Sequence, residues 1–477
     1  MSGRTNREEF KFKLNNMLTD LRKKIINGEI VIGEYLPSEL ILARQYELSK
    51  NSVRKGLEEL VSEGLIVKKS RIGNVVVTNR PFDQIILRVG YYPSLVKDAK
   101  FPELIKMFEE KHPNIKIQTI ALPYQNYKET VNDFFQNDMI DVVTLNQWDY
   151  TDFLNNKIDV FEPMSKDKNV YSFLQNPFVD DMQSENIYVK PFVFSPIVLC
   201  YNKDHFDNKQ IPYPDSSWKW DDALEAAKQL LVDDSQDRTC GLYFHPLSIN
   251  RWPIFLLQNK VAFQYKENGE MNFPITELIT SVNFIKKLYE EQGILQTFLS
   301  DDDRDAEKLF LEQKVSMIVT SYFSLNEIKN HEISYDIAPI PYLKDAKTLL
   351  LIIGMAINNQ STKKDAAKMF VDFIADVDAQ TLIRQETLSI PAYKKIAEKN
   401  GTDLIKKPSR YHLFREIIPS FALYNDLGLN GQDLSELRNE LRIYLSDLMD
   451  DKIFIQRISA KLSRKESKTN VLRGEEL

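Results

Sequence analysis

Residues 49–64 read SKNSVRKGLEELVSEG and decide the fold of the N-terminal region. Ser49 is a favoured residue for the start of a helix, because its hydroxyl accepts a hydrogen bond from an unpaired backbone N–H of the first turn. Gly64 is a favoured residue for its end. Between them the apolar side chains recur at helical spacing, namely Val53, Leu57, Leu60 and Val61. The segment therefore predicts one amphipathic helix.

Two further helices and a hairpin flank this helix. Apolar side chains follow helical spacing over residues 14–26, and Gly28 supplies a stop. Pro37 and Ser38 open a second short helix, residues 39–46, whose apolar residues are Leu40, Ile41 and Ala43. The apolar triplets 65–67 and 75–77 enclose a polar, basic turn and predict a β-hairpin. Three helices followed by a hairpin predict a winged helix-turn-helix, an α+β domain.

The side of the third helix opposite its apolar face carries Lys50, Asn51 and Arg54 near the N-terminus. A recognition helix presents such positions to base edges in the DNA major groove. The plainer alternatives are solvation for Lys50 and, for Arg54, an ion pair with Glu58 one turn later. We expect this surface to contact double-stranded operator DNA.

Three motifs in order, GEYLPSE at 33–39, SKNSVR at 49–54 and EGLI at 63–66, resemble the DNA-binding domain of the GntR family. The family often has Arg where Leu40 and Lys50 stand, Thr at Ser52 and Gly at Arg71, which bears on the operator rather than on the fold. The resemblance implies a dimer on paired half-sites, with the wing toward the minor groove. The residues that it implies at the DNA are Ser38, Arg44, Ser49, Lys50, Asn51, Ser52, Arg54, Arg71 and Gly73.

The charge of the chain is uneven. The 477 residues carry a net charge of -7, with 43% hydrophobic and 27% charged residues. Residues 1–80 hold 15 basic and 10 acidic side chains, a net of +5, whereas the rest holds 47 basic and 59 acidic ones, a net of -12. A basic head on an acidic body is typical of a DNA-binding module joined to a domain that binds something else.

Beyond residue 86 strand-like and helix-like segments alternate. Strands are expected at 87–91, 115–121 and 141–145, with amphipathic helices between them. This alternation predicts βαβ units and a parallel sheet, whose ligands bind beyond the carboxyl ends of the strands. Two aromatic loops follow such ends, Tyr91-Tyr92 and Gln147-Trp148-Asp149-Tyr150.

Residues 87 to about 465 resemble the extracellular solute-binding proteins that feed sugar importers. The motifs that carry the resemblance are FEEKHPNIKI at 108–117, CYNKDHF at 200–206, SWKWDDAL at 217–224, VSMIVTSY at 315–322, AAKMF at 366–370 and SIPA at 389–392. The resemblance implies a type II periplasmic-binding-protein fold, in which two α/β lobes close over a ligand by hinge motion. The expected ligand is a mono- or oligosaccharide.

A sugar site pairs flat aromatic rings with polar side chains that satisfy the hydroxyls. Trp148 and Trp252 lie in polar segments, at loops or helix starts, and for them we weigh ligand contact against core packing equally. Trp218 and Trp220 are expected to be structural. The candidate ligand-binding residues, by position in the resemblance, are Tyr92, Trp148, Asp149, His245, Arg251, Trp252 and Tyr322.

Enzymatic alternatives lack their motifs. An aminotransferase-like domain with pyridoxal phosphate, which also occurs behind GntR heads, needs a Schiff-base lysine in a setting that the sequence does not offer. Five scattered histidines and two cysteines predict no metal centre, and no cofactor is expected. A transport protein that has lost its signal is a second alternative, which the DNA-binding head disfavours.

These patterns predict four segments. A winged-helix domain occupies residues 8–78, a linker 79–86, a two-lobed effector domain 87–465 and a charged, disordered tail 466–477. The N-terminal residues contain no apolar run typical of a secretory signal, and no segment is apolar enough for a membrane span. We therefore expect a cytoplasmic, homodimeric transcription regulator without enzymatic activity.

Overall fold

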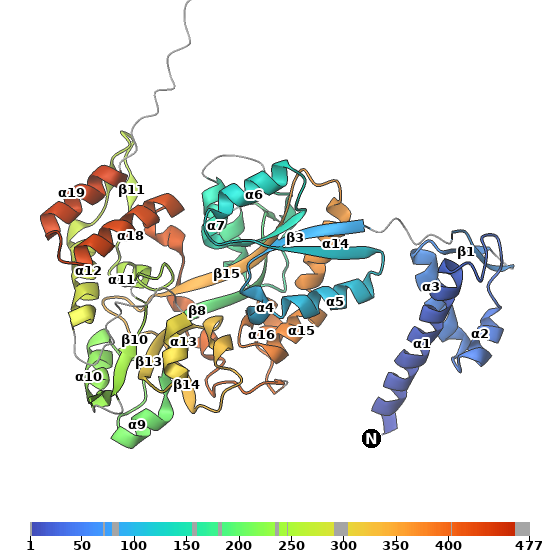
Figure 1. Cartoon of the computed structure of the whole chain (residues 1–477), viewed down its shortest axis with the longest axis horizontal. Helices are drawn as coiled ribbons and strands as arrows, with labels where there is room; N and C mark the ends of the chain where they lie inside the picture. Colours follow the sequence, from blue (N-terminus) through green and yellow to red (C-terminus); the bar gives the residue numbers. More distant parts are fainter. Residues whose placement is uncertain are drawn as a thin grey trace, which may run out of the picture. The chain divides into compact units, whose positions relative to one another are not determined.

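The computed structural model describes residues 2–69, 72–78, 85–154, 160–179, 184–233, 238–245, 247–290, 304–401 and 403–462. The chain divides into two compact units, residues 1–87 with 106–118 and residues 88–105 with 119–477. The helices and strands of residues 2–78 form a winged-helix head, and those of residues 85–462 form a two-lobed domain (Figure 1).

The head contains three helices and a two-stranded hairpin. The elements are α1 (Ser2–Ile26), α2 (Glu39–Gln45), α3 (Lys50–Ser62), β1 (Ile66–Lys69) and β2 (Gly73–Val76). β1 and β2 pair antiparallel, and the chain before α2 adds a further edge, where Gly33 N donates to Val76 O (2.8 Å). The predicted winged helix-turn-helix is confirmed.

The core of the head lies between its three helices. The side chains buried in it include Met17, Leu18, Leu21, Ile25, Leu42, Val53, Leu57, Leu60, Ile66 and Val76. α3 approaches α1 closely at Gly56, where a Cβ atom would lie 2.8 Å from Met17 Cε. Two of the three apolar residues expected on the core side of α2 are placed differently, because Leu40 and Ile41 are 54% and 55% exposed. Leu42 is buried in the core, and Ala43 packs against it as expected.

The two-lobed domain is built on an 11-stranded sheet whose main path runs β4-β3-β5-β15-β8-β13-β10-β9. β3 is parallel to β5, as the alternation predicts, and β10 is parallel to β13. β8 and β15 are antiparallel to each other and to their outer neighbours β13 and β5. The sheet is therefore mixed rather than parallel, because β15 runs opposite to β3 and β5, and β8 runs opposite to β10 and β13. The strands are β3 (Ile85–Tyr91), β4 (Ile115–Ala121), β5 (Val142–Asn146), β8 (Lys190–Asn202), β9 (Val232–Asp233), β10 (Arg238–Tyr243), β13 (Val315–Ser321) and β15 (Thr348–Ile357).

β8 and β15 pass from one lobe to the other (Figure 1). The helices of the first lobe include α6 (Tyr127–Gln136), α7 (Gln147–Leu154) and α14 (Lys364–Ile374). Those of the second lobe include α10 (Trp220–Leu230), α11 (Pro253–Gln258), α12 (Ile275–Glu290), α18 (Gly431–Leu445) and α19 (Asp451–Leu462). The predicted two-lobed α/β fold is confirmed.

Shorter elements complete the domain. The helical ones are α4 (Leu95–Asp98), α5 (Phe101–Lys111), α8 (Ser172–Gln175), η1 (Asn176–Phe178), α9 (Lys203–Lys209), α13 (Arg304–Leu311), η2 (Ser324–Glu327), α15 (Val377–Glu386), α16 (Lys394–Ala397), α17 (Leu413–Glu416), η3 (Ile418–Ser420) and η4 (Tyr424–Leu427). The strands are β6 (Met164–Ser165), β7 (Asn186–Ile187), β11 (Gln264–Tyr265), β12 (Met271–Asn272), β14 (Tyr335–Ala338), β16 (Ile390–Pro391) and β17 (Phe421–Ala422).

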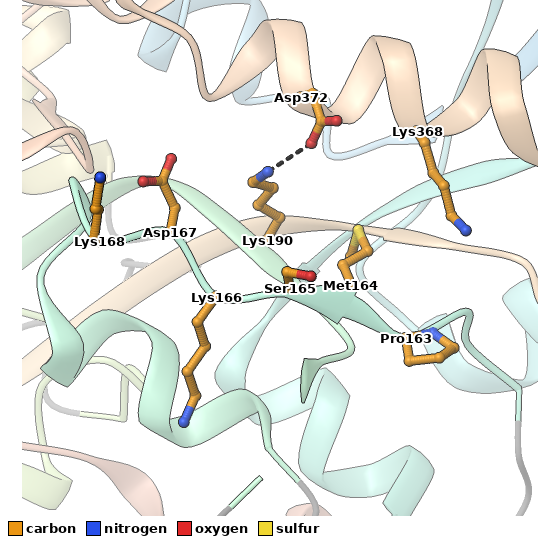
Figure 2. Close-up of a pocket in the computed structure, with 9 residues that line it drawn as sticks. All are labelled: Pro163, Met164, Ser165, Lys166, Asp167, Lys168, Lys190, Lys368 and Asp372. Atoms are coloured by element: carbon orange, nitrogen blue, oxygen red, sulfur yellow. Dashed lines mark hydrogen bonds and ion pairs between the residues drawn. The ribbon is translucent and has the colours of Figure 1, made fainter. Parts of the chain in front are cut away.

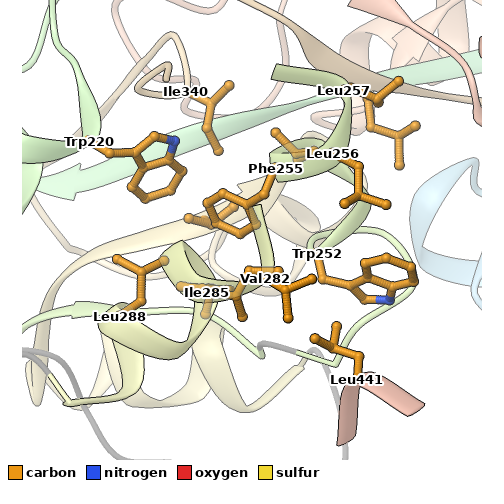
Figure 3. Packing of buried hydrophobic residues seen from close by; sticks show 14 of the residues in the cluster. Trp220, Trp252, Phe255, Leu256, Leu257, Val282, Ile285, Leu288, Ile340 and Leu441 are labelled. Carbon is orange, nitrogen blue, oxygen red and sulfur yellow. The ribbon is translucent and has the colours of Figure 1, made fainter. Parts of the chain in front are cut away.

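A large hydrophobic cluster fills the second lobe (Figure 3). Trp220 starts α10 and packs on Phe255, with ring centroids 5.0 Å apart, while its Nε1 donates to Gln258 Oε1 (2.9 Å). The expectation of a structural role for Trp220 is confirmed. Figure 3 also shows Trp252 inside the same cluster, beside Leu441 of α18.

Cys200 and Cys240 are buried free thiols. Over the ranges that the structure describes, no helix combines the length and the apolar character that a membrane span requires. Over the same ranges no three His, Cys, Asp or Glu side chains gather closely enough to hold a metal ion.

Candidate functional site

The candidate DNA-binding surface lies at the N-terminal ends of α2 and α3. Ser38 Oγ accepts from Ile41 N (3.3 Å) and caps α2, and Ser49 Oγ accepts from Ser52 N (3.1 Å) and caps α3. Lys50, Asn51 and Arg54 are exposed, and Ser52 is half-buried. The N-terminus of α3 carries the positive end of the helix dipole, and Lys50 and Arg54 add two positive charges there. This positive surface suits a DNA phosphate backbone.

Arg54 is held by α2. Its Nη2 donates to Glu39 Oε2 (2.9 Å) and its Nε to Glu39 Oε1 (3.2 Å). The Arg54 guanidinium holds the pKa of Glu39 below its usual value. Sequence spacing offered Glu58 as the partner, whereas the structure pairs Arg54 with a carboxylate 15 residues earlier. Exposed ion pairs of this kind contribute little to stability, so DNA can compete for the arginine.

Two other predicted DNA contacts lie away from α3. Arg44 is exposed in the last turn of α2. Gly73 begins β2 with φ of 140°, a conformation that favours glycine, and lies against the ring of Tyr35. Arg71 lies outside the described residues.

In the first lobe the buried Tyr92 pairs with the half-buried Asp149 where β3 and β5 end. The Tyr92 hydroxyl donates to Asp149 Oδ2 and accepts from Asn146 N (3.1 Å), and its ring stacks on Tyr124 with centroids 5.5 Å apart. Burial raises the pKa of Asp149 to about 7, and the bond from Tyr92 opposes that rise. These polar atoms satisfy one another, so the pair fixes the start of α7.

Trp148 reaches across to the second lobe. Its half-buried ring meets the edge of Tyr424 in η4, with centroids 5.1 Å apart. The Tyr424 hydroxyl donates to Asn250 Oδ1 (2.7 Å), in the loop before α11. Tyr424 therefore brings the segments of two predicted ligand residues, Trp148 and Trp252, into one neighbourhood.

Three side chains in these segments hold buried polar atoms without a hydrogen-bond partner. In the described part of the chain, both amide atoms of Gln147, Nε1 of Trp252 and Nδ1 of His245 are unpaired. Gln147 and Trp252 are each 1% exposed. Buried polar atoms in proteins are nearly always paired. Unpaired atoms also occur elsewhere in the described residues, for instance at Tyr335 and His412, so these three side chains are candidates for contact with a ligand or water.

Gln147 was not among the residues chosen from the sequence. The available signal was its position, since it directly follows β5 at the carboxyl end of the strand.

Arg251 and Tyr322 form hydrogen bonds within the domain. Arg251 is 3% exposed and its Nε donates to Val319 O of β13 (3.0 Å). The Tyr322 hydroxyl donates to Tyr411 O (2.9 Å), and its backbone N–H donates to Ser195 Oγ (2.7 Å). The structure thus gives both residues intramolecular partners, and their ligand contact remains a prediction.

A separate cavity of about 550 Å³ opens on the first lobe (Figure 2). Lys190 Nζ contacts Asp372 Oδ1 at 2.6 Å in it, and Lys368 is paired with Glu162 (2.7 Å). In Figure 2 the ammonium of Lys166 points away from the Lys190–Asp372 pair. The residues around the cavity include no aromatic ring, so it does not suit a sugar face.

Two family profiles match the chain in separate places. The profile described as bacterial extracellular solute-binding protein matches residues 92–381, and the one described as bacterial regulatory proteins, gntR family, matches residues 15–76. Neither description is that of an enzyme family, and the first overturns the alternative of an aminotransferase-like domain.

Individual proteins also match either the head or the two-lobed domain. The arabinose metabolism transcriptional repressor of Geobacillus stearothermophilus is 32% identical over 87 residues, 18% of this chain and 24% of the repressor. The galactooligosaccharide-binding protein of Bacillus subtilis is 21% identical over 350 residues, 70% of this chain and 78% of that protein.

Solved structures share the two-lobed fold. A substrate-binding protein of Listeria monocytogenes in complex with cycloalternan superposes with a TM-score of 0.67 at 18% identity, covering 80% of this chain and 98% of that one. The GacH receptor of Streptomyces glaucescens gives a TM-score of 0.68 at 14% identity, with the same coverage.

Proposed function

Because the chain belongs to the bacterial extracellular solute-binding protein family and carries a gntR family domain at its N-terminal end, we propose that it is a transcription regulator that senses a carbohydrate. The head binds operator DNA, and the two-lobed domain binds a mono- or oligosaccharide. Binding of the sugar changes the affinity of the head for its operator.

One observation carries the choice of ligand, the unpaired polar atoms of Gln147, Trp252 and His245. An amide, an indole N–H and an imidazole nitrogen offer donors and acceptors without a fixed charge. Sugar hydroxyls both donate and accept, so a neutral polyol satisfies such a set, whereas a phosphate or carboxylate ligand calls for a cation. The nearest predicted cation, Arg251, already donates to Val319 O.

The aromatic residues supply the complementary apolar surface. Trp148 is the one half-buried ring among the four aromatic side chains predicted at the ligand, and it stands against Tyr424. Rings of this kind stack on the C–H face of a sugar. The names of similar proteins support the same class, since they bind galactooligosaccharide, cycloalternan or acarbose.

The head acts as half of a dimer in this proposal. Winged-helix regulators of two-fold symmetry read half-sites about one DNA turn apart. Arg54, released from Glu39, and Lys50 at the start of α3 read a base edge or a phosphate. A DNA-binding head favours a regulator in the cytoplasm over a binding protein that delivers solute to a transporter.

The test is a thermal-shift screen on the full chain. A ligand at 100 times its Kd stabilises the folded state by about 2.7 kcal/mol. We expect hits among galactooligosaccharides, maltodextrins, cyclic glucans and monosaccharides, and none among amino acids, peptides or sugar phosphates. Saturation by a charged metabolite, with no response to any sugar, contradicts the ligand class.

A Gln147→Leu variant is the control for the location of the site. It removes the unpaired amide at nearly the same volume, so sugar binding is expected to weaken while the fold stays intact. The matched control is Gln175→Leu in the same lobe, whose amide is already paired with Asp167.

A further inference from the structure

Beside the candidate ligand site the two lobes touch directly. Asp152, in α7 of the first lobe, accepts a hydrogen bond at Oδ1 from the backbone N–H of Gly431, the first residue of α18 (2.9 Å). The preceding residue, Thr151, donates from Oγ1 to Asn425 Oδ1 of the second lobe (3.1 Å). These contacts stand one helical turn from Trp148, so they adjoin the place where a ligand would bind.

The Asp152 contact satisfies a group that α18 leaves unpaired. The N–H groups of the first helical turn have no partner within a helix. The capping box of α18 pairs Asn430 with Asp433, where Asn430 Oδ1 accepts from Asp433 N (2.9 Å). The capping box leaves the N–H of Gly431 without an acceptor among the described residues of the second lobe. The carboxylate of Asp152 in the first lobe accepts from it, and the positive end of the helix dipole also favours that negative charge.

Gly431 is required by this contact and not by its backbone conformation. A Cβ atom at this position would lie 2.3 Å from Asp152 Oδ2 and 2.4 Å from Oδ1. The residue is not among those with positive φ, so other residues fit its conformation. The close approach of the carboxylate therefore accounts for glycine at this position.

We propose that Asp152 and Gly431 form a latch between the lobes, which holds the domain closed and thereby sets its affinity for ligand. Burial raises the pKa of Asp152, and the Gly431 N–H opposes that rise, so the hydrogen bond favours the carboxylate. The latch acts on lobe closure whatever the ligand is. Its use in sensing rests on the proposed function.

The latch is tested by the distance between the lobes in the ligand-free full chain. Spin labels on cysteines at Asp133→Cys in α6 and Gln229→Cys in α10 report that distance by double electron–electron resonance. Both native thiols are buried and stay unlabelled under native conditions. Each label sits on an exposed helical position away from the contact.

Asp152→Ala removes the acceptor, and Gly431→Ala introduces a methyl group that displaces it. Each is expected to raise the ratio of open to closed molecules by roughly tenfold, the effect of one lost hydrogen bond to a charged group. The double variant is expected to match Asp152→Ala alone, because the alanine at 431 then has no carboxylate to displace. Asp222→Ala is the matched control, since its carboxylate caps α10 within one lobe by accepting from Lys219 N (2.8 Å).

Unchanged distance distributions in both single variants overturn the latch. So do fully additive effects in the double variant, or an equal opening in Asp222→Ala. A sugar screen without hits leaves these distances as they are, and a failed latch leaves sugar binding intact. The two outcomes therefore separate the latch from the proposed function.

Discussion

The head and the two-lobed domain place their predicted contact residues in opposite environments. In the head, Lys50, Asn51 and Arg54 are exposed, as a DNA-reading surface requires. In the two-lobed domain, four of the predicted ligand residues are at most 3% exposed, namely Tyr92, Arg251, Trp252 and Tyr322. The predicted contact residues thus lie on the surface in one region and largely in the core of the other.

The difference has a physical origin. A recognition surface is a property of one helix, whose spacing fixes which side chains face the core and which face solvent. A cleft is assembled from segments far apart in the chain, such as residues 148, 250 and 424. Position beside a helix start therefore identifies the segment of a ligand site without identifying the side chain that reaches the ligand.

The largest expected effect is a loss of stability on substitution of a tryptophan, and it differs between Trp252 and Trp148. Trp252→Ala removes a ring from the core cluster and is expected to lower the free energy of unfolding by about 3–5 kcal/mol. Trp148→Ala, at a half-buried position, is expected to cost less stability and to reduce sugar affinity. Chemical denaturation followed by circular dichroism measures the first effect. Equal losses of stability in both variants remove the distinction.

Substitution of Gln147 is expected to change the free energy of unfolding in the opposite direction. Since its buried amide has no partner, Gln147→Leu is expected to raise the free energy of unfolding of the ligand-free chain by about 1–3 kcal/mol while weakening sugar binding. Denaturation without sugar, and calorimetric titration with the best sugar of the screen, measure the two changes. A destabilised variant with normal sugar affinity assigns the residue to packing.

In the head, Arg54→Ala is expected to cost about 1–3 kcal/mol of operator affinity and to relax specificity at one base pair. Glu39→Gln keeps the size of the partner but removes the charge that holds Arg54, so it is expected to leave operator affinity unchanged or higher. Gel shifts with promoter DNA of its own gene measure both. If Arg54→Ala and Lys50→Ala both bind normally, α3 is not the recognition helix.

A pH dependence is expected in the first lobe. The pKa of Asp149 is raised to about 7 in the folded chain, so the folded state holds a proton that the unfolded chain releases near pH 4. The contribution of Asp149 to stability therefore declines as the pH rises from about 4 to 7, and levels off above 7. Asp149→Asn is expected to flatten that decline in melting curves recorded from pH 4 to 8. An unchanged slope contradicts a buried carboxyl group at this position.

Sequence patterns predicted the architecture, and they predicted where the helices of the head begin. The caps Ser38 and Ser49 start α2 and α3 as expected, because capping is a local property. The mixed sheet was not predicted, because the reversed direction of β15 depends on a chain that crosses between lobes. The partner of Arg54 and the unpaired amide of Gln147 depend on tertiary neighbours for the same reason.

The central claim is that sugar binding in one region changes DNA binding in the other. Coupling between two sites is reciprocal, so operator DNA must change sugar affinity by the same factor as sugar changes operator affinity. The measurement is a titration of the full chain with its best sugar, with and without saturating operator. A change of about 5- to 150-fold in sugar Kd is the expected result for ordinary allosteric coupling. An identical Kd in both titrations contradicts the claim and leaves two independent binding modules on one chain.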